Sequence, residues 1–175
     1  MNIFGHKGPA CNETIFIASD HAGFEMKKAL VAFLKHDMGC KVKDCGAHEL
    51  TIDDDYPVFV AAAVAKVSED PENRRGIIVG GSGQGEAIVA NRFKRVRAVV
   101  YYGEPVKKQT DAKGVELGLI ESTRIHNNAN VLSLGARFLD IEHAKDVIRV
   151  WLSTPFPGEP RHQRRIEQID SHETT

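Results

Sequence analysis

Short strand-like runs, most of them apolar, alternate along the chain with stretches in which apolar residues recur every three or four positions. The strand-like runs are TIFIASD at 14–20, CKVKDCG at 40–46, GIIVGG at 76–81, VRAVVYY at 96–102 and NVLSLGARF at 130–138. The periodic stretches lie at 24–39, after Asp55, after Glu86 and at 141–154. A short continuous apolar run predicts a buried strand, and a period near 3.6 residues predicts an amphipathic helix.

Repeated alternation of buried strands and helices is typical of a parallel sheet covered by helices on both faces. We therefore predict a Rossmann-like, doubly wound three-layer α/β/α sandwich with a five-stranded parallel sheet. A chain of 175 residues favours one domain. We place this single domain, including a C-terminal helix, at 14–170, with an N-terminal extension at 1–13 and a tail at 171–175.

Composition narrows the function classes. The chain has 23 Lys and Arg against 24 Asp and Glu, so no excess positive charge points to a nucleic acid partner. The apolar run at 58–65 is far shorter than the ~20 residues that span a bilayer, and the N-terminus has no signal-type segment. Cys11, Cys40 and Cys45 are an odd number without metal-ligand spacing, which favours free thiols. We expect a cytoplasmic protein that binds neither nucleic acid nor membrane, with no metal site and no cofactor.

The glycine-rich stretch VGGSGQGEAIVAN at 79–91 is the first candidate for chemistry. Four glycines in six positions let backbone amides approach a ligand, and these amides precede a predicted helix that starts near Glu86. The spacing is not G-x-G-x-x-G, because position 86 is Glu, and no G-K-[ST] follows. The stretch predicts a cradle for a phosphate or a developing oxyanion. A tight turn, with Glu86 only stabilising the start of the helix, is the alternative.

Doubly wound folds bind ligands beyond the carboxyl ends of their strands, and we group two further sets of residues with the loops there. The first strand ends with Asp20 and His21, and the segment before the fifth strand contains His126 and Asn127. Each pair alone also fits an ordinary cap or turn. Together with the glycine stretch, they supply groups that move protons on a small molecule.

The segment RHQRR at 161–165 adds positive charge near the C-terminus. Arg161 and Arg165 are four residues apart, so on a helix they share one face and can clamp one phosphate. Arg164 would point elsewhere. A solvated basic surface is the alternative interpretation.

From about Thr14 to Ile169 the chain resembles the family of ribose-5-phosphate isomerase B and galactose-6-phosphate isomerase subunits. The resemblance rests on SDHAGFEMK, DYP, GGSGQGEAIVANR, HNNANVLSLGAR and RHQRRI, in family order. It implies conversion of ribose 5-phosphate to ribulose 5-phosphate through a cis-enediol, without a metal. In one branch of the family a cysteine opens the glycine loop as the base, but here that position is Gly80. The other branch uses a glutamate at the end of the loop, which is Glu86 here.

The resemblance assigns further roles to individual residues. It implies that His126, assisted by Asp20, opens the sugar ring and that Asn127 holds sugar hydroxyls. The expected stabilisers of the enediolate are the Ser82 hydroxyl and the loop formed by Gly81, Gly83, Gln84 and Gly85. The expected phosphate ligands are His21, Arg137, Arg161 and Arg165, and Tyr56 is expected to line the sugar pocket.

The resemblance also implies a homodimer or a dimer of dimers with active sites shared across the interface. We expect His126, Asn127 and Arg137 to come from the neighbour of the chain that supplies Glu86. The segment 102–125 looks longer than in typical members, which keeps open a six-carbon substrate such as galactose 6-phosphate or allose 6-phosphate. The replacement of the cysteine by Gly80 keeps open a non-catalytic sugar-phosphate-binding protein.

Overall fold

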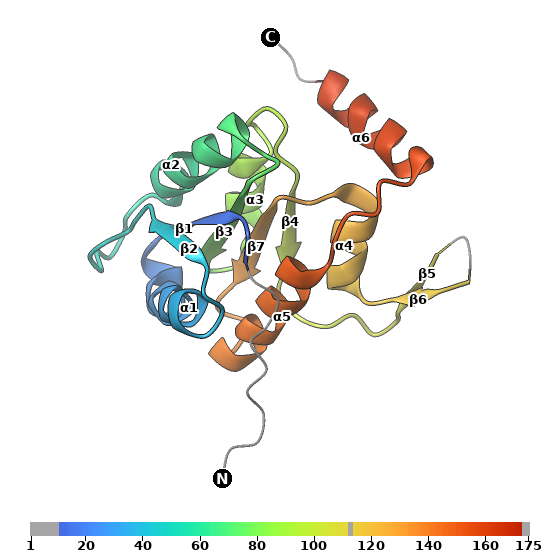
Figure 1. Ribbon diagram of the computed structural model, residues 1–175. Helices are drawn as coiled ribbons and strands as arrows, with labels where there is room; N and C mark the ends of the chain where they lie inside the picture. Colours follow the sequence, from blue (N-terminus) through green and yellow to red (C-terminus); the bar gives the residue numbers. More distant parts are fainter. Residues whose placement is uncertain (1–10, 112–113, 173–175) are drawn as a thin grey trace.

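The computed structural model describes residues 11–111 and 114–172 (Figure 1). Its main sheet has five parallel strands in the order β2-β1-β3-β7-β4. They are β1 (Thr14–Ser19), β2 (Lys41–Asp44), β3 (Arg74–Gly80), β4 (Ala98–Tyr101) and β7 (Val131–Gly135). The five predicted strands and their parallel arrangement are confirmed.

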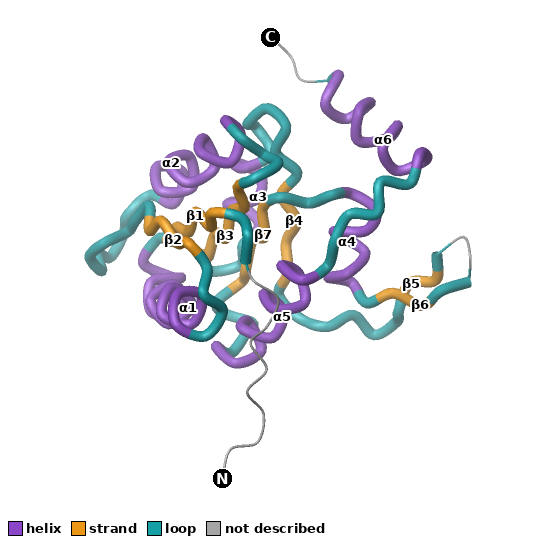
Figure 2. Tube along the Cα trace, viewed as in Figure 1, coloured by secondary structure: helices purple, strands orange, loops and turns teal. Residues whose placement is uncertain are grey.

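Helices cover both faces of this sheet, as Figure 2 shows. The helices α1 (Phe24–His36) and α5 (Ile141–Ser153) pack on one face, and α4 (Leu119–Asn127) lies against α5. The helices α2 (Tyr56–Glu69) and α3 (Gln84–Ala90) pack on the other face. The three-layer α/β/α prediction is therefore confirmed.

Alternation along β3 explains why both faces need a cover. Ile77 and Val79 belong to the core on the α1 and α5 side, which includes Trp151. Ile78 points to the other side and packs in the core that includes Val64 of α2. All five side chains are fully buried. A strand that is apolar on both faces would expose one apolar side to water without two layers of helices.

The segment after β4 contains elements that the pattern did not predict. Strands β5 (Gln109–Thr110) and β6 (Glu116–Leu117) form a separate antiparallel hairpin, which leads into α4. The predicted C-terminal helix is α6 (Pro160–Ser171), and Figure 1 shows it standing apart from the layered body. No helix in the described part of the chain is both long and apolar enough to cross a membrane. Residues 1–10 of the predicted N-terminal extension and residues 173–175 of the predicted tail lie outside the described residues.

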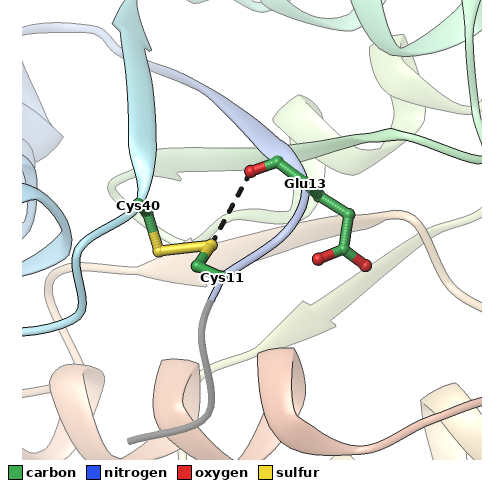
Figure 3. Close-up of a disulfide and its surroundings, with 3 residues drawn as sticks. All are labelled: Cys11, Glu13 and Cys40. Atoms are coloured by element: carbon green, nitrogen blue, oxygen red, sulfur yellow. Dashed lines mark hydrogen bonds between the residues drawn. A yellow bond between two sulfur atoms is a disulfide. The ribbon is translucent and has the colours of Figure 1, made fainter. Parts of the chain in front are cut away.

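The prediction of three free thiols was wrong. Cys11 and Cys40 form a disulfide, and Cys45 remains a free cysteine (Figure 3). The two sulfurs meet because Cys11 lies just before β1 and Cys40 just before β2, and these neighbouring strands pair Thr14 with Lys41. Their Cα atoms are 5.0 Å apart, although 29 positions separate them in the sequence. An odd number of cysteines with irregular spacing could not reveal a contact that depends on strand order.

Candidate functional site

The order of the strands places the first candidate groups at one edge of the sheet. β1 and β3 are neighbours, but β2 lies beyond β1 on one side and β7 lies beyond β3 on the other. Doubly wound folds bind ligands at such a reversal, and we call the region beyond the carboxyl ends of β1 and β3 the crevice. Asp20 and His21 directly follow β1, and the glycine loop (Gly80–Gly85) follows β3. The structure therefore brings these two predicted groups to one crevice.

Glu86 lies over the start of the glycine loop. Its side chain is buried, and a Cβ atom added to Gly80 would overlap the Glu86 carboxylate. Burial raises the pKa of Glu86, and the nearby charge of Asp20 also raises it, whereas a backbone hydrogen bond and Arg137 oppose this shift. The carboxylate occupies the space that a side chain at position 80 would need. Glycine at 80 and glutamate at 86 are thus fitted to each other.

The glycine loop is held by close contacts on several sides. Gly83 has a left-handed backbone with φ 76°, which favours glycine, and the Ser133 hydroxyl donates to its carbonyl oxygen at 2.6 Å. The Ser82 hydroxyl accepts from the Gln84 amide at 3.3 Å. A Cβ atom at Gly85 would meet the Tyr56 ring, so Tyr56 packs against the glycine loop, and its role in a sugar pocket stays a prediction.

Arg137 belongs to this edge of the same chain. Its guanidinium carbon lies 3.1 Å from the position of a Cβ atom built on Gly81, and its amide donates to the Gly81 carbonyl at 3.1 Å. The reason is that Arg137 follows β7, whose last residue Gly135 pairs with Gly80. We expected Arg137 to reach Glu86 from a neighbouring chain. This expectation is wrong, because Arg137 lies beside the glycine loop of its own chain.

His126 and Asn127 lie in a different place. They end α4 and precede β7, so they lie at the amino end of the sheet, although we had grouped them with loops at the carboxyl ends. They line a cavity of about 440 Å³, which we call the amino-end pocket. Its lining residues are Gln109, Thr110, Asp111, Ser122, His126, Asn127, Glu159, Arg161, His162 and Arg165.

The arginines of α6 follow the predicted helical face. Arg161 and Arg165 both line the amino-end pocket, and Arg164 does not. The pocket therefore combines two guanidinium groups with His126 and the Asn127 amide, a set that suits an anionic, hydroxylated ligand. Their roles toward a substrate remain predictions.

The amino-end pocket and the glycine loop cannot meet within one chain. The five residues of β7 separate the two edges of the sheet, which corresponds to about 17 Å of strand. In Figure 1 the arrows of β4 and β7 point downward, whereas α6 stands at the top of the view. The amino-end pocket and the glycine loop thus lie at opposite ends of the strands of one chain.

Two side chains near His126 were missed by the sequence analysis. His162 is buried and stacks on His126, with ring centroids 4.5 Å apart and ring planes at 15°. Burial lowers the pKa of His162, and the charges of His126 and Arg161 act in the same direction. The side-chain nitrogen Nε2 of Gln109, in the β5–β6 hairpin, lies 3.2 Å from Nδ1 of His126. Nothing in the local sequence pattern placed either residue beside His126.

Asp54 was also missed. Its Oδ1 lies 2.6 Å from Nδ1 of His21 and accepts from the His21 backbone amide at 2.9 Å. The hydrogen bond to Asp54 is the main cause that raises the pKa of His21. The run Asp53–Asp55 indicates negative charge near the DYP motif. It does not indicate which of the three carboxylates contacts His21.

Asp20, His21 and Asp54 form the cluster of metal-ligand types in the described part of the chain, with ligand atoms within 4.8 Å of one another. Atoms of all three residues already have protein partners. Nδ1 of His21 lies 2.6 Å from Oδ1 of Asp54, and Oδ1 of Asp20 accepts from the amides of Ala22 and Gly23 at 3.0 and 3.2 Å. The arrangement resembles an ion pair beside a helix cap more than a cation site.

Comparisons with known proteins show which family the chain is similar to. The model of the Ribose/Galactose Isomerase family matches residues 15–169. Ribose-5-phosphate isomerase B from Mycolicibacterium paratuberculosis is 37% identical over 161 residues, which cover 92% of each chain. A probable ribose-5-phosphate isomerase B from Mycoplasma genitalium is 37% identical over 160 residues, covering 91% of this chain and 95% of that protein.

Solved structures show the same fold. The crystal structure of ribose-5-phosphate isomerase B from Mycoplasma genitalium, with bound ribulose-5-phosphate, superposes with a TM-score of 0.80 at 34% identity and covers 91% of this chain and 95% of that chain. The enzyme from Thermotoga maritima gives a TM-score of 0.76 at 35% identity, covering 91% and 98%. Because the family model spans most of the chain and close relatives cover it almost fully, the chain belongs to the Ribose/Galactose Isomerase family.

Proposed function

We propose that the protein interconverts ribose 5-phosphate and ribulose 5-phosphate through a cis-enediol, with Glu86 as the base. The observation that carries this proposal is the buried Glu86 carboxylate, which lies over Gly80 at the crevice of the sheet. The family and its named ribose-5-phosphate isomerase B relatives support the substrate.

The geometry suits a proton transfer between neighbouring carbons. Glu86 takes the proton from C2 of the open-chain aldose and returns it to C1, while a proton moves from the hydroxyl at C2 to the oxygen at C1. A carboxylate whose pKa is raised by burial is a stronger base than an ordinary glutamate. Negative charge develops on the enediolate oxygen, where the loop amides and the Ser82 hydroxyl can donate hydrogen bonds.

The remaining roles require a second copy of the chain. We infer a homodimer or a dimer of dimers in which the amino-end pocket of one chain faces the glycine loop of its partner. His126 then opens the sugar ring together with Asp20, and Asn127 binds sugar hydroxyls. The phosphate is bound by His21 and Arg137 from one chain and by Arg161 and Arg165 from the other.

A six-carbon sugar phosphate is the second candidate substrate. The observation that favours it is the β5–β6 hairpin, which supplies Gln109 and Thr110 to the wall of the amino-end pocket. A kinetic panel of ribose, allose and galactose phosphates distinguishes the candidates by kcat/KM. Turnover of none of them, with retained binding, would instead support a non-catalytic binding protein.

We further propose a cytoplasmic location, because a phosphorylated sugar carries charge and does not cross a bilayer unaided. The Cys11–Cys40 disulfide is unusual for a reducing compartment. Acid quenching of the cells that produce the protein, followed by thiol counting, would test this location. Full oxidation of Cys11 and Cys40 in the quenched protein would contradict a cytoplasmic location.

The substitution Glu86→Gln tests the proposed base. Glutamine keeps the size of the side chain but removes its basicity, so kcat should fall by at least ~10² while KM changes only a few-fold. The exposed Glu25, in the first turn of α1, provides the control Glu25→Gln, which should leave both constants unchanged. Near-normal turnover of Glu86→Gln would show that Glu86 only stabilises the start of α3.

A further inference from the structure

His21 is held by a single carboxylate oxygen through both its backbone and its ring. Oδ1 of Asp54 accepts from the His21 amide at 2.9 Å and lies 2.6 Å from Nδ1. The Asp54 side chain is 9% exposed, whereas the His21 side chain is 32% exposed. The carboxylate thus forms the buried end of this pair, and the imidazole forms the end that is open to the crevice.

This contact fixes the proton on the inner nitrogen of the ring. A carboxylate can only accept, so Nδ1 of His21 carries a hydrogen and donates it to Asp54. A ring that is also protonated at Nε2 then presents a second N–H group on its open side. The other oxygen of Asp54, Oδ2, is buried and has no hydrogen-bond partner among the described residues, so the pair gains most from a positive charge on His21.

The surroundings of His21 favour that charge. The ionisable groups that act on it are Asp20, Asp53 and Asp54, all carboxylates, and all three raise its pKa, while partial burial lowers it. Asp20 precedes His21 at the end of β1, and Asp53 and Asp54 belong to the loop before α2.

We propose that Asp54 is a positioning residue that keeps His21 as an imidazolium, with Nε2–H directed at the phosphate of the substrate. The proposal rests on the proposed function and names the group that prepares its phosphate site. A charged donor forms a shorter and stronger hydrogen bond to phosphate than a neutral one. A carboxylate at position 54 therefore affects substrate affinity without touching the substrate.

The matched variants are Asp54→Asn and Asp53→Asn. Asparagine at 54 still accepts from the His21 amide, but it removes the charge that faces the ring. Asp53 is exposed and has φ 71°, a left-handed conformation that asparagine tolerates, so Asp53→Asn removes one charge from the same loop without this contact. Thermal unfolding of each variant shows whether the fold is retained.

The first measurement is an NMR pH titration of the His21 ring, assigned by comparison with His21→Gln and needing no turnover. The wild-type midpoint should lie above about 6.5, Asp54→Asn should lower it by about one pH unit, and Asp53→Asn should change it much less. Repeating the titration with inorganic phosphate should move the wild-type midpoint upward, because bound phosphate favours the imidazolium.

The second measurement is KM for ribose 5-phosphate from pH 5.5 to 9. Asp54→Asn should raise KM by up to about tenfold at pH values between the two measured midpoints, where the wild-type ring is the more protonated of the two. The two proteins should converge at pH values below both midpoints. A wild-type midpoint at or below 6.5, or an equal midpoint in a folded Asp54→Asn protein, would overturn the proposal. A KM increase that is the same at every pH would also overturn it, because it would indicate only structural damage. If the enzyme turns over none of the sugar phosphates, the titrations with inorganic phosphate still decide the role of Asp54.

Discussion

Single residues at the crevice fit one another in ways that a sequence shows only in part. The glycine stretch and the glutamate after it were recognisable, because glycines that precede a helix mark a close approach of backbone to ligand. The fit between Gly80 and Glu86 could not be recognised from the sequence, because it depends on how the Glu86 side chain lies over the loop. The same limit applies to Asp54. The sequence does not distinguish the three adjacent aspartates, and only the loop conformation places one of them beside His21.

The burial of Glu86 predicts a dependence of stability on pH. Its pKa is raised in the folded state, so the folded protein binds a proton more readily than the unfolded chain does. The stabilising contribution of protonated Glu86 is full below the unfolded pKa of about 4.3 and is lost as the pH rises through the folded pKa. Above the folded pKa, the ionised carboxylate is therefore less favourable in its buried position than in the unfolded chain.

Glu86→Gln should consequently unfold at a higher temperature than the wild type at pH 7.5, and the difference should shrink as the pH falls toward 4. Differential scanning calorimetry at several pH values measures this. Glu25→Gln, at an exposed site, should show no such trend. A Glu86→Gln protein that is less stable than the wild type at pH 7.5 would mean that the ionised carboxylate is well paired in the fold.

Among the elements, those with a clean period were predicted and those without one were not. α5 presents Ala144, Val147, Ile148 and Trp151 to the core, as its spacing required. The segment between β4 and β7 mixes charged, polar and glycine positions, and its hairpin and α4 left no single period to detect. These unpredicted elements carry His126 and the wall of the amino-end pocket, so half of the candidate site depended on structure that the pattern could not reveal.

Helix α6 allows a test of its predicted binding face. Arg161 and Arg165 line the amino-end pocket one helical turn apart, and each charge-assisted contact to phosphate contributes about 1.5–3 kcal/mol. Arg165→Ala should therefore raise KM by about ten- to a hundredfold, as measured by initial rates. Arg164→Ala, which removes an equal charge from an exposed neighbouring position outside the pocket, should change KM little. Equal effects of the two substitutions would mean that α6 acts only through its total charge.

At the scale of the whole molecule, the strand order separates groups that the proposed mechanism uses together. The five strands run parallel, so every residue that follows a strand lies at one edge and every residue that precedes a strand lies at the other. Glu86 and His126 fall on opposite edges for this reason. Single-chain periodicity predicts the edges, but it contains no information on how two copies pack, so the complete site could be inferred only from the family resemblance.

Mixed dimers test this arrangement directly. One chain carries Glu86→Gln, its partner carries His126→Asn, and two different affinity tags select dimers that contain one of each. If the glycine loop of one chain faces the amino-end pocket of the other, one site in each dimer has both substitutions and the second site has none. Such dimers should retain about half of the wild-type kcat, although each parent homodimer is nearly inactive.

The reciprocal dimer supplies the control. Here one chain carries both substitutions and its partner is wild type, so shared sites would each contain one defect and kcat should fall close to that of the parents. Sites built within single chains predict the reverse, because the wild-type partner would keep a complete site. Half activity in the reciprocal dimer, together with an inactive first dimer, would contradict the shared site. It would show that His126 and Glu86 of the same chain act in one active site.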